Sequence, residues 1–251
     1  MKQTRIMMGM TITVEVVDEK VKESDLEKIF DYFESVNQRF SVYKENSEIS
    51  KINRGEITEP DFSSEMKEVF ALSEQTKKET NGYFDIKKPN GLIDTSGLVK
   101  GWAIYKAAQI LWADGFKNFF VDAGGDIQTS GVNSKGEPWT IGIRSPFNPE
   151  TEIVKVLQLK DRGVATSGNY IRGNHVYNPL SKDTILNDII SITVIGPNVY
   201  EADRFATAVF AMGREGINFI ENLEGFEGYA IDSKGIATMT SGFNNYVKKD
   251  A

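Results

Sequence analysis

The sequence of 251 residues contains no cysteine. This absence excludes disulfides, zinc–thiolate sites and thiol catalysis. It does not locate the protein, because a chain without cysteine tolerates both oxidising and reducing compartments. Long apolar runs are also absent from the sequence. No window of the sequence approaches the length that a membrane-spanning helix requires, so we expect no transmembrane segment.

Positive charge is scarce. The chain has 29 Lys and Arg against 36 Asp and Glu, which gives a net charge of −7 and a pI near 5.0. Non-specific nucleic-acid binding relies on clustered Lys and Arg that neutralise phosphates, so we expect no nucleic-acid partner. An acidic protein that handles a polyphosphate needs a metal ion or backbone N–H donors to hold the phosphate charge.

The first ten residues lack the pattern of an export signal. They contain no apolar stretch followed by a small-residue cleavage site, and they lead directly into a strand pattern. For the sequence as given, we therefore expect a cytoplasmic protein. The alternative is an extracytoplasmic protein from which an export leader has been removed.

The order of the expected elements indicates the fold class. Hydrophobic residues make up 40% and charged residues 26%, as in ordinary globular proteins. The periodicity predicts helices over 24–40, 64–79, 98–113 and 201–212, a loop over 41–54, and strands over 10–17, 119–122, 139–144, 152–159, 163–167 and 189–195. Strands that follow one another in runs favour an α+β fold, mixed but with largely antiparallel sheets and packed helices. We expect a single domain over 1–251, or two closely fused halves.

A carboxylate and a hydroxyl are spaced for one face of the last long helix. Asp203 and Thr207 lie four residues apart, so a helix places both oxygens on the same side. Oxygen ligands of this kind are those that Mg²⁺ prefers. The alternative is an ordinary, partly exposed helix without a ligand role, and the spacing alone favours that alternative.

His175 is the only histidine of the chain. Imidazole takes up a proton near neutral pH, which suits the activation of a hydroxyl nucleophile. The alternative is a surface or structural histidine with no chemical role. If the protein uses imidazole chemistry, it must use His175.

Three glycine-containing turns lie next to predicted strands or helices, over 94–101, 122–126 and 165–168. Glycine allows backbone N–H groups to approach a phosphate closely. The first turn opens a helix, whose N-terminus favours anions, and Lys100 adds a positive charge there. None of the three matches a standard dinucleotide or phosphate-binding loop, and each alone is more often a simple turn.

Taken in order along the chain, these segments resemble the ApbE family, whose members are FAD:protein FMN transferases. The segments are Met8–Met10, 40–53, 82–86, 94–101, 121–126, 165–168, 175–179 and 202–210. The resemblance covers nearly the whole chain. Its most specific parts are the Asp-Ala-Gly-Gly-Asp turn at 122–126 and the Ala-Asp-x-x-Ala-Thr pattern at 202–207.

The resemblance implies an ApbE-like fold and a mechanism. FAD is the substrate, and its pyrophosphate binds Mg²⁺. A Ser or Thr hydroxyl in a flavinylation motif of an acceptor protein attacks the FMN-side phosphorus, and AMP leaves. Asp203 and Thr207, with a backbone carbonyl near Gly97, are implied as metal ligands. His175 is implied as the catalytic residue near the acceptor hydroxyl.

The resemblance also implies a set of residues around the flavin nucleotide. They are Met8, Phe40, Tyr43, Phe84, Asp85, Asp94, Lys100, Asp122, Gly124, Gly125, Asp126, Thr166 and Ser167. Three positions depart from the usual family pattern. Asn178 replaces an Asp before the proline, Ser96 replaces the first glycine of a pair, and Arg204 follows Asp203 where a small or apolar residue is commoner.

Two other functions fit the same residues. An FAD pyrophosphatase would use the same metal ion with water as the acceptor, and a non-catalytic FAD-binding protein would release nothing. The transferase and the pyrophosphatase both release AMP, but only the transferase leaves a covalent flavin on an acceptor protein.

Overall fold

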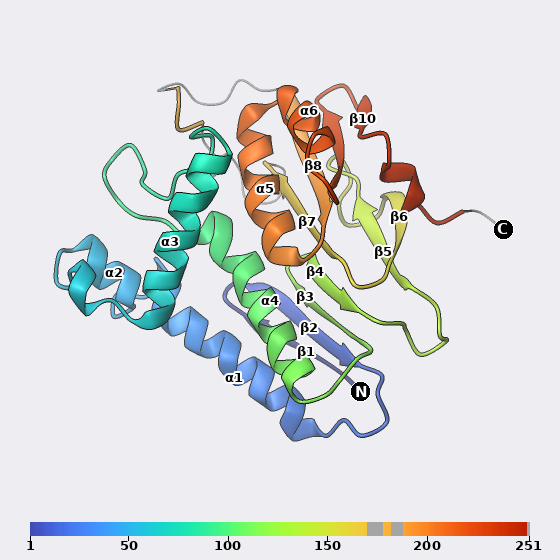
Figure 1. The fold of residues 1–251 in the computed structure, drawn as a ribbon, viewed down its shortest axis with the longest axis horizontal. Helices are drawn as coiled ribbons and strands as arrows, with labels where there is room; N and C mark the ends of the chain where they lie inside the picture. Colours follow the sequence, from blue (N-terminus) through green and yellow to red (C-terminus); the bar gives the residue numbers. More distant parts are fainter. Residues whose placement is uncertain (170–177, 182–187, 250–251) are drawn as a thin grey trace.

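A computed structural model describes residues 1–169, 178–181 and 188–249 of the chain (Figure 1). Its main feature is an eight-stranded sheet with the order β1-β2-β3-β4-β7-β8-β9-β10, in which every neighbouring pair is antiparallel. β5 and β6 form a separate antiparallel hairpin. The strands are β1 (Lys2–Met7), β2 (Met10–Val16), β3 (Phe119–Ala123), β4 (Asp126–Ser130), β5 (Trp139–Arg144), β6 (Ile153–Leu159), β7 (Gly163–Gly168), β8 (Ile189–Gly196), β9 (Glu227–Asp232) and β10 (Ala237–Met239).

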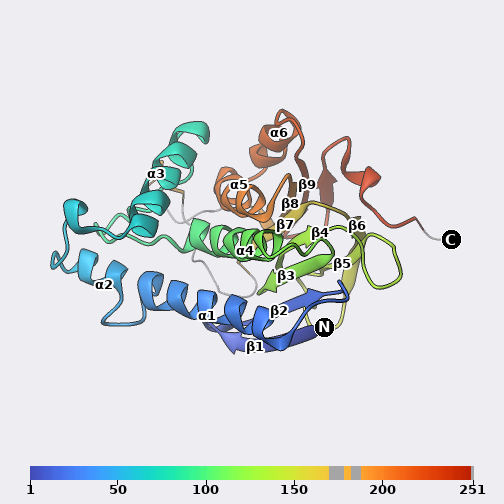
Figure 2. The same ribbon diagram turned by 60° about the horizontal axis from the view of Figure 1, so that its bottom comes forward.

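The helices gather on one side of the large sheet, as the rotated view shows (Figure 2). They are α1 (Glu23–Phe40), α2 (Glu48–Asn53), α3 (Ser64–Glu79), α4 (Ser96–Ala113), α5 (Val199–Met212) and α6 (Glu215–Glu221), with short 3₁₀ turns η1 (Glu59–Asp61) and η2 (Phe243–Asn245). Within the described residues, no helix combines the length and the apolar character needed to cross a bilayer.

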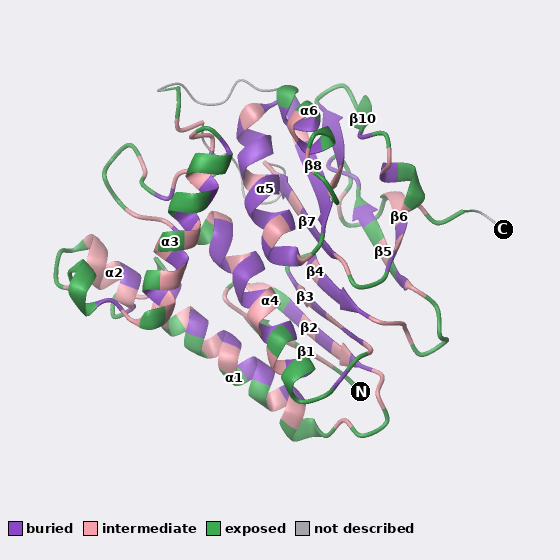
Figure 3. Ribbon diagram, viewed as in Figure 1, coloured by how far each residue is buried: buried purple, intermediate pink, exposed green. Residues whose placement is uncertain are grey.

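The core has three parts. Two of them lie on opposite faces of the large sheet, because successive side chains along a strand point to opposite faces. On β7 to β9, Ala165, Val194 and Ala230 pack against α5 and α6. Their neighbours Val164 and Ile195 point to the other face and pack against the β5–β6 hairpin. The third part joins α1, α4 and β1 to β3. Buried residues accordingly follow the central strands and α5 in Figure 3.

The expected α+β fold with largely antiparallel sheets is confirmed, and the predicted helix over 64–79 is correct at both ends. The predicted loop over 41–54 is wrong, because α2 begins there after Ser47, whose hydroxyl accepts the Ser50 N–H at 3.1 Å. The helix predicted over 24–40 is α1, which begins one residue earlier, at Glu23. The Lys22 N–H donates to Asp25 Oδ2 at 2.7 Å at this end of the helix. β4 was not predicted.

Candidate functional site

A cavity of about 620 Å³ lies between the large sheet, the β5–β6 hairpin, the start of α4 and the middle of α5. Pockets of this size commonly hold small-molecule ligands. Thirteen residues implied by the family resemblance line it: Phe84, Asp85, Asp94, Gly97, Lys100, Asp122, Gly124, Gly125, Asp126, Thr166, Ser167, Asp203 and Thr207. The fold therefore brings together segments that lie far apart in the sequence.

Two glycines allow α4 and α5 to cross closely at the cavity. A Cβ at Gly101 would lie 2.5 Å from the Asp203 Cβ, and one at Gly97 would lie 3.0 Å from Thr207 Cγ2. The close approach permits two hydrogen bonds between the helices. The Gly101 N–H donates to Asp203 Oδ2 at 2.7 Å, and Thr207 Oγ1 donates to the Gly97 carbonyl at 3.1 Å. The three implied metal ligands are therefore held at this crossing.

The turn between β3 and β4 brings two more carboxylates to the cavity. Gly124 and Gly125 have φ angles of +64° and +95°, which favour glycine over other residues. The Gly125 N–H donates to Asp122 Oδ1 at 2.8 Å and so closes the turn. Asp126 follows at the start of β4, where its Oδ1 accepts the Thr166 N–H at 3.1 Å.

Two buried carboxylates share one lysine in this cavity. Lys100 Nζ lies 2.5 Å from Asp126 Oδ2 and 4.0 Å from Asp203 Oδ1. Burial raises the pKa of Asp203 to about 7; Lys100 opposes the shift and the Asp126 charge adds to it. Burial also raises the pKa of Asp122. The site thus favours an additional positive charge, either a proton or a cation.

The oxygen atoms at this site suit Mg²⁺ as a partial ligand set. Asp126 Oδ2 is buried and, apart from its ion pair with Lys100, has no hydrogen-bond partner in the described part of the chain. No three acidic or histidine side chains among the described residues are grouped closely enough to hold a metal by themselves. Mg²⁺ commonly takes one or two carboxylates and completes its shell with water and substrate phosphate. The carboxylate of Asp203, the Thr207 hydroxyl and the Gly97 carbonyl fit that pattern.

The segment between α3 and α4 forms another side of the cavity. Phe84 is buried there, and its N–H donates to Thr80 Oγ1 at 3.2 Å. Lys88 Nζ pairs with Asp94 Oδ2 at 2.5 Å. Burial acts to raise the pKa of Asp94, but the bonds from Lys88 and Ser96 outweigh it and hold the pKa below its ordinary value. Asp94 is therefore a carboxylate with its partners already in place.

Four implied residues do not line the described cavity. Phe40 lies in the core with its ring centroid 5.5 Å from that of Trp102, and Tyr43 is 96% exposed. Met8 packs against the core, although its neighbours Gly9 and Met10 do line the cavity. His175 lies outside the described residues.

The hairpin side of the cavity was missed by sequence reasoning. Ile141, Ile143 and Arg144 of β5 line it, as does Thr193 of β8. β5 was predicted correctly as a strand, but strand periodicity carries no signal for the surface on which a hairpin docks. That docking depends on long-range packing against β7 to β9.

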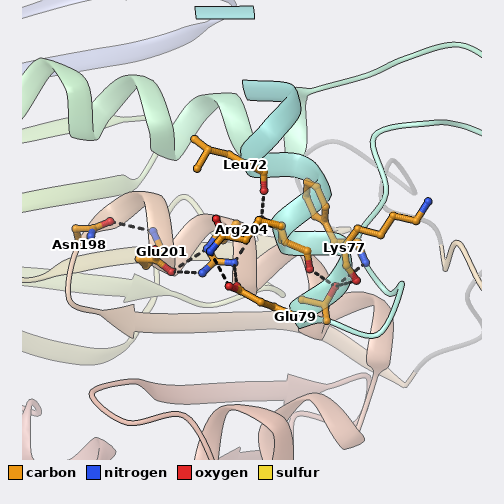
Figure 4. Close-up of polar contacts among 10 residues, drawn as sticks. Leu72, Lys77, Glu79, Asn198, Glu201 and Arg204 are labelled. Carbon is orange, nitrogen blue, oxygen red and sulfur yellow. Dashed lines mark hydrogen bonds and ion pairs between the residues drawn. The ribbon is translucent and has the colours of Figure 1, made fainter. Parts of the chain in front are cut away.

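Arg204, next to Asp203, does not line the cavity, and its polar contacts join α5 to α3 (Figure 4). We call its polar contacts the Arg204 network. Its Nε donates to Glu201 Oε2 at 2.8 Å, and Nη1 donates to Thr76 Oγ1 at 3.3 Å and forms an ion pair with Glu79. The Arg204 guanidinium also lies 4.0 Å from the centroid of the Phe205 ring. Arg204, which replaces the usual small or apolar family residue, therefore has hydrogen-bond and ion-pair partners within the fold.

The model of one protein family, described as the ApbE family, matches residues 8–89 and 86–230. Among curated proteins, the FAD:protein FMN transferase of Vibrio cholerae is 24% identical over 257 residues, which cover 80% of this chain and 76% of that protein. The FAD:protein FMN transferase of Escherichia coli K12 is 28% identical over 166 residues, which cover 63% of this chain and 47% of that protein.

Solved structures share the fold. The flavin transferase ApbE from Vibrio cholerae aligns with a TM-score of 0.85 and 21% identity over 98% of both chains. The crystal structure of the ApbE protein from Thermotoga maritima aligns with a TM-score of 0.85 and 21% identity over 99% of both chains. At this level of identity the likeness establishes the arrangement of strands and helices around the cavity.

Proposed function

The chain belongs to the ApbE family, and from this premise we propose that it is an enzyme that transfers FMN from FAD to a protein hydroxyl. The acceptor is a Ser or Thr of another protein, the metal ion is Mg²⁺, and the second product is AMP. The names of the curated relatives support flavin transfer from FAD. The metal, the acceptor residue and the leaving group are the finer parts of the proposal.

One observation supports the metal ion. Asp203, Thr207 and Gly97 all lie at a close helix crossing, and all three line a cavity that the glycine turn at 122–126 also lines. In phosphoryl chemistry a protein mainly positions the reacting groups and neutralises charge. Mg²⁺ held at this crossing would neutralise charge on the pyrophosphate, which a cavity rich in aspartates would otherwise repel.

The reaction exchanges one phosphorus–oxygen bond for another. The acceptor hydroxyl oxygen forms a bond to the FMN-side phosphorus, and the bond from that phosphorus to the bridging oxygen breaks. AMP leaves with the bridging oxygen, and the hydroxyl proton passes to a base. Lys100 lines the same cavity, where its positive charge is already paired with Asp126.

We assign the role of base to His175, the only histidine of the chain. Its replacement in His175→Ala should slow transfer by roughly 10²–10⁴-fold, the range that a general base contributes. Covalent flavin formed per unit time measures the effect. A variant that transfers at the normal rate would make His175 a residue without a catalytic role.

The experiment that tests the whole proposal measures AMP release from FAD and Mg²⁺, with and without an acceptor peptide that carries a flavinylation motif. AMP that requires the acceptor, together with acid-resistant flavin on the peptide, is the expected result. AMP released equally without acceptor would identify an FAD pyrophosphatase instead. Tight FAD binding without any AMP would identify a non-catalytic carrier.

A further inference from the structure

The lining of the cavity carries more negative than positive charge. Among the described residues, five carboxylates line it against three cations: Asp85, Asp94, Asp122, Asp126 and Asp203 against Lys88, Lys100 and Arg144. A pyrophosphate brings further negative charge into the same space. The charge of one divalent cation at the helix crossing is largely offset by the carboxylates around it. The phosphate must therefore be neutralised by cationic side chains of the cavity lining.

Two of the three cations are already engaged. Lys88 Nζ lies 2.5 Å from Asp94 Oδ2, and Lys100 Nζ lies 2.5 Å from Asp126 Oδ2. Arg144 is exposed and makes no ion pair within residues 1–169, 178–181 and 188–249. Its charge acts on the nearby Asp122 carboxylate without a direct ion pair, so among the cations of the described lining it is the one with donors open to a ligand.

Arg144 lies beside a bulge in a hairpin that packs on the large sheet. The register of β5 against β6 shifts between Ile143 and Arg144: Ile143 lies opposite Lys155 and Arg144 opposite Ile153, which leaves Val154 unpaired. A bulge of this kind redirects side chains and is common next to binding sites. The hairpin itself is fixed on the large sheet by the buried side chain of Ile143 and its neighbours on β6.

We propose that Arg144 binds a phosphate oxygen of the FAD pyrophosphate, reaching it from the β5–β6 hairpin while Asp203 and Thr207 hold the metal ion from α5. This inference rests on the proposed function, because it takes FAD as the ligand. The planar guanidinium presents a pair of N–H donors to a phosphate, and such charge-assisted bonds are among the stronger polar contacts. Arg144 is in this role a phosphate-binding residue that fixes where the pyrophosphate lies.

The test compares the binding of FAD with that of riboflavin, which has the same ring system but no phosphate. Calorimetric titrations at constant Mg²⁺, without acceptor, would use the wild type, Arg144→Met and Arg144→Lys, with AMP measured to verify that FAD stays intact. Lys155→Met is the matched control, because Lys155 is a cation of the same hairpin that does not line the cavity.

Arg144→Met should weaken FAD binding roughly 10- to 100-fold and leave riboflavin binding within about twofold. Arg144→Lys should fall between wild type and Arg144→Met, and Lys155→Met should match the wild type. Equal losses for FAD and riboflavin, or no loss for FAD, would overturn the role of Arg144 while the proposed function stands. A wild-type protein that does not bind FAD would overturn both.

Discussion

Asp203 and Arg204 are consecutive residues of α5, yet they belong to two charge groups that differ in their access to water. The Asp203 cluster (Asp203, Asp126 and Lys100) faces the cavity, whereas the Arg204 network (Arg204, Glu79, Glu201 and Thr76) joins α5 to α3. Each has one cation and two carboxylates. The Asp126 and Asp203 side chains are only 2% and 5% exposed, whereas those of Glu79 and Glu201 are 37% and 24% exposed.

The two groups therefore shift the pKa of a carboxylate in opposite directions. Burial acts to raise the pKa of Glu79, but the hydrogen bonds from Gln75 and Arg204 outweigh it, and the pKa falls below its ordinary value. Burial wins at Asp203, whose pKa rises to about 7. The two groups have the same number of charges but differ in their exposure to water. The more exposed Arg204 network stabilises the fold, whereas the buried Asp203 cluster is ready to take up a cation.

The largest effect is expected from Asp203→Asn, which keeps the shape of the side chain and removes its charge. FAD turnover should fall by at least about 10³-fold, because the stabilisation that a metal ion gives to phosphoryl chemistry amounts to several kcal/mol. The variant should unfold at the same temperature as the wild type or higher, because its neutral amide at this position removes the cost of burying a charge. AMP release and thermal unfolding measure the two effects.

The same variant tests metal binding without activity. Mg²⁺ should raise the unfolding midpoint of the wild type, since a ligand that binds only the folded state stabilises it. This rise should be absent in Asp203→Asn. An undiminished rise, or undiminished turnover, would remove Asp203 from the metal site.

The neighbouring variant Arg204→Met should have the opposite profile. It removes the hydrogen bonds and ion pairs of the Arg204 network, and the two carboxylates left behind keep some contact with water, so stability should fall by about 1.5–3 kcal/mol. Turnover, measured well below the unfolding midpoint, should stay within about tenfold of the wild type, because Arg204 does not line the cavity. Urea unfolding gives the stability. A loss of turnover as large as that of Asp203→Asn would show that the two charge groups are not separate.

A smaller effect is expected in the pH dependence of stability. Because the pKa of Glu79 is lowered by folding, its contribution to stability is present above its ordinary value of 4.5 and is lost as the pH falls through the lower folded-state value. Much of this contribution depends on Arg204. The stability difference between wild type and Arg204→Met should therefore narrow as the pH falls below the ordinary Glu79 value of 4.5.

Urea unfolding across this pH range checks the narrowing, and Glu79→Gln is the control. In the Glu79→Gln background, the difference made by Arg204→Met should vary less with pH, because the titrating partner is gone. A difference that stays constant with pH in both backgrounds would contradict the assignment of the shift to Glu79.

Local patterns were sufficient to predict much of the Asp203 cluster. The four-residue spacing of Asp203 and Thr207 and the glycine turn at 122–126 are visible in the sequence, and both reach the cavity. The same helical periodicity places Phe40 on the apolar face of α1, and the core position of Phe40 follows from that face rather than from its distance from a polar loop.

The features that sequence reasoning missed depend on contacts between distant residues. β4 is hard to recognise because its buried residues include polar ones, such as Gln128, whose Oε1 accepts the Val199 N–H at 2.9 Å. Two partners of Arg204 are equally distant, since Thr76 and Glu79 lie on α3. A single sequence does not reveal such pairings, because each is satisfied only once the helices and strands have packed.

The smallest effect is expected from the ion pair between Asp85 and Lys77, a residue of α3 that lies close to Glu79 (Figure 4). Lys77 Nζ is 2.6 Å from Asp85 Oδ2, but the lysine side chain is 42% exposed, so water screens the attraction. Lys77→Met should change stability by less than about 1 kcal/mol. The loss of stability in urea unfolding could instead equal that of Arg204→Met. In that case exposure to water would not determine how much a charged pair on α3 stabilises the fold. The two charge groups would then have to differ in some property other than exposure.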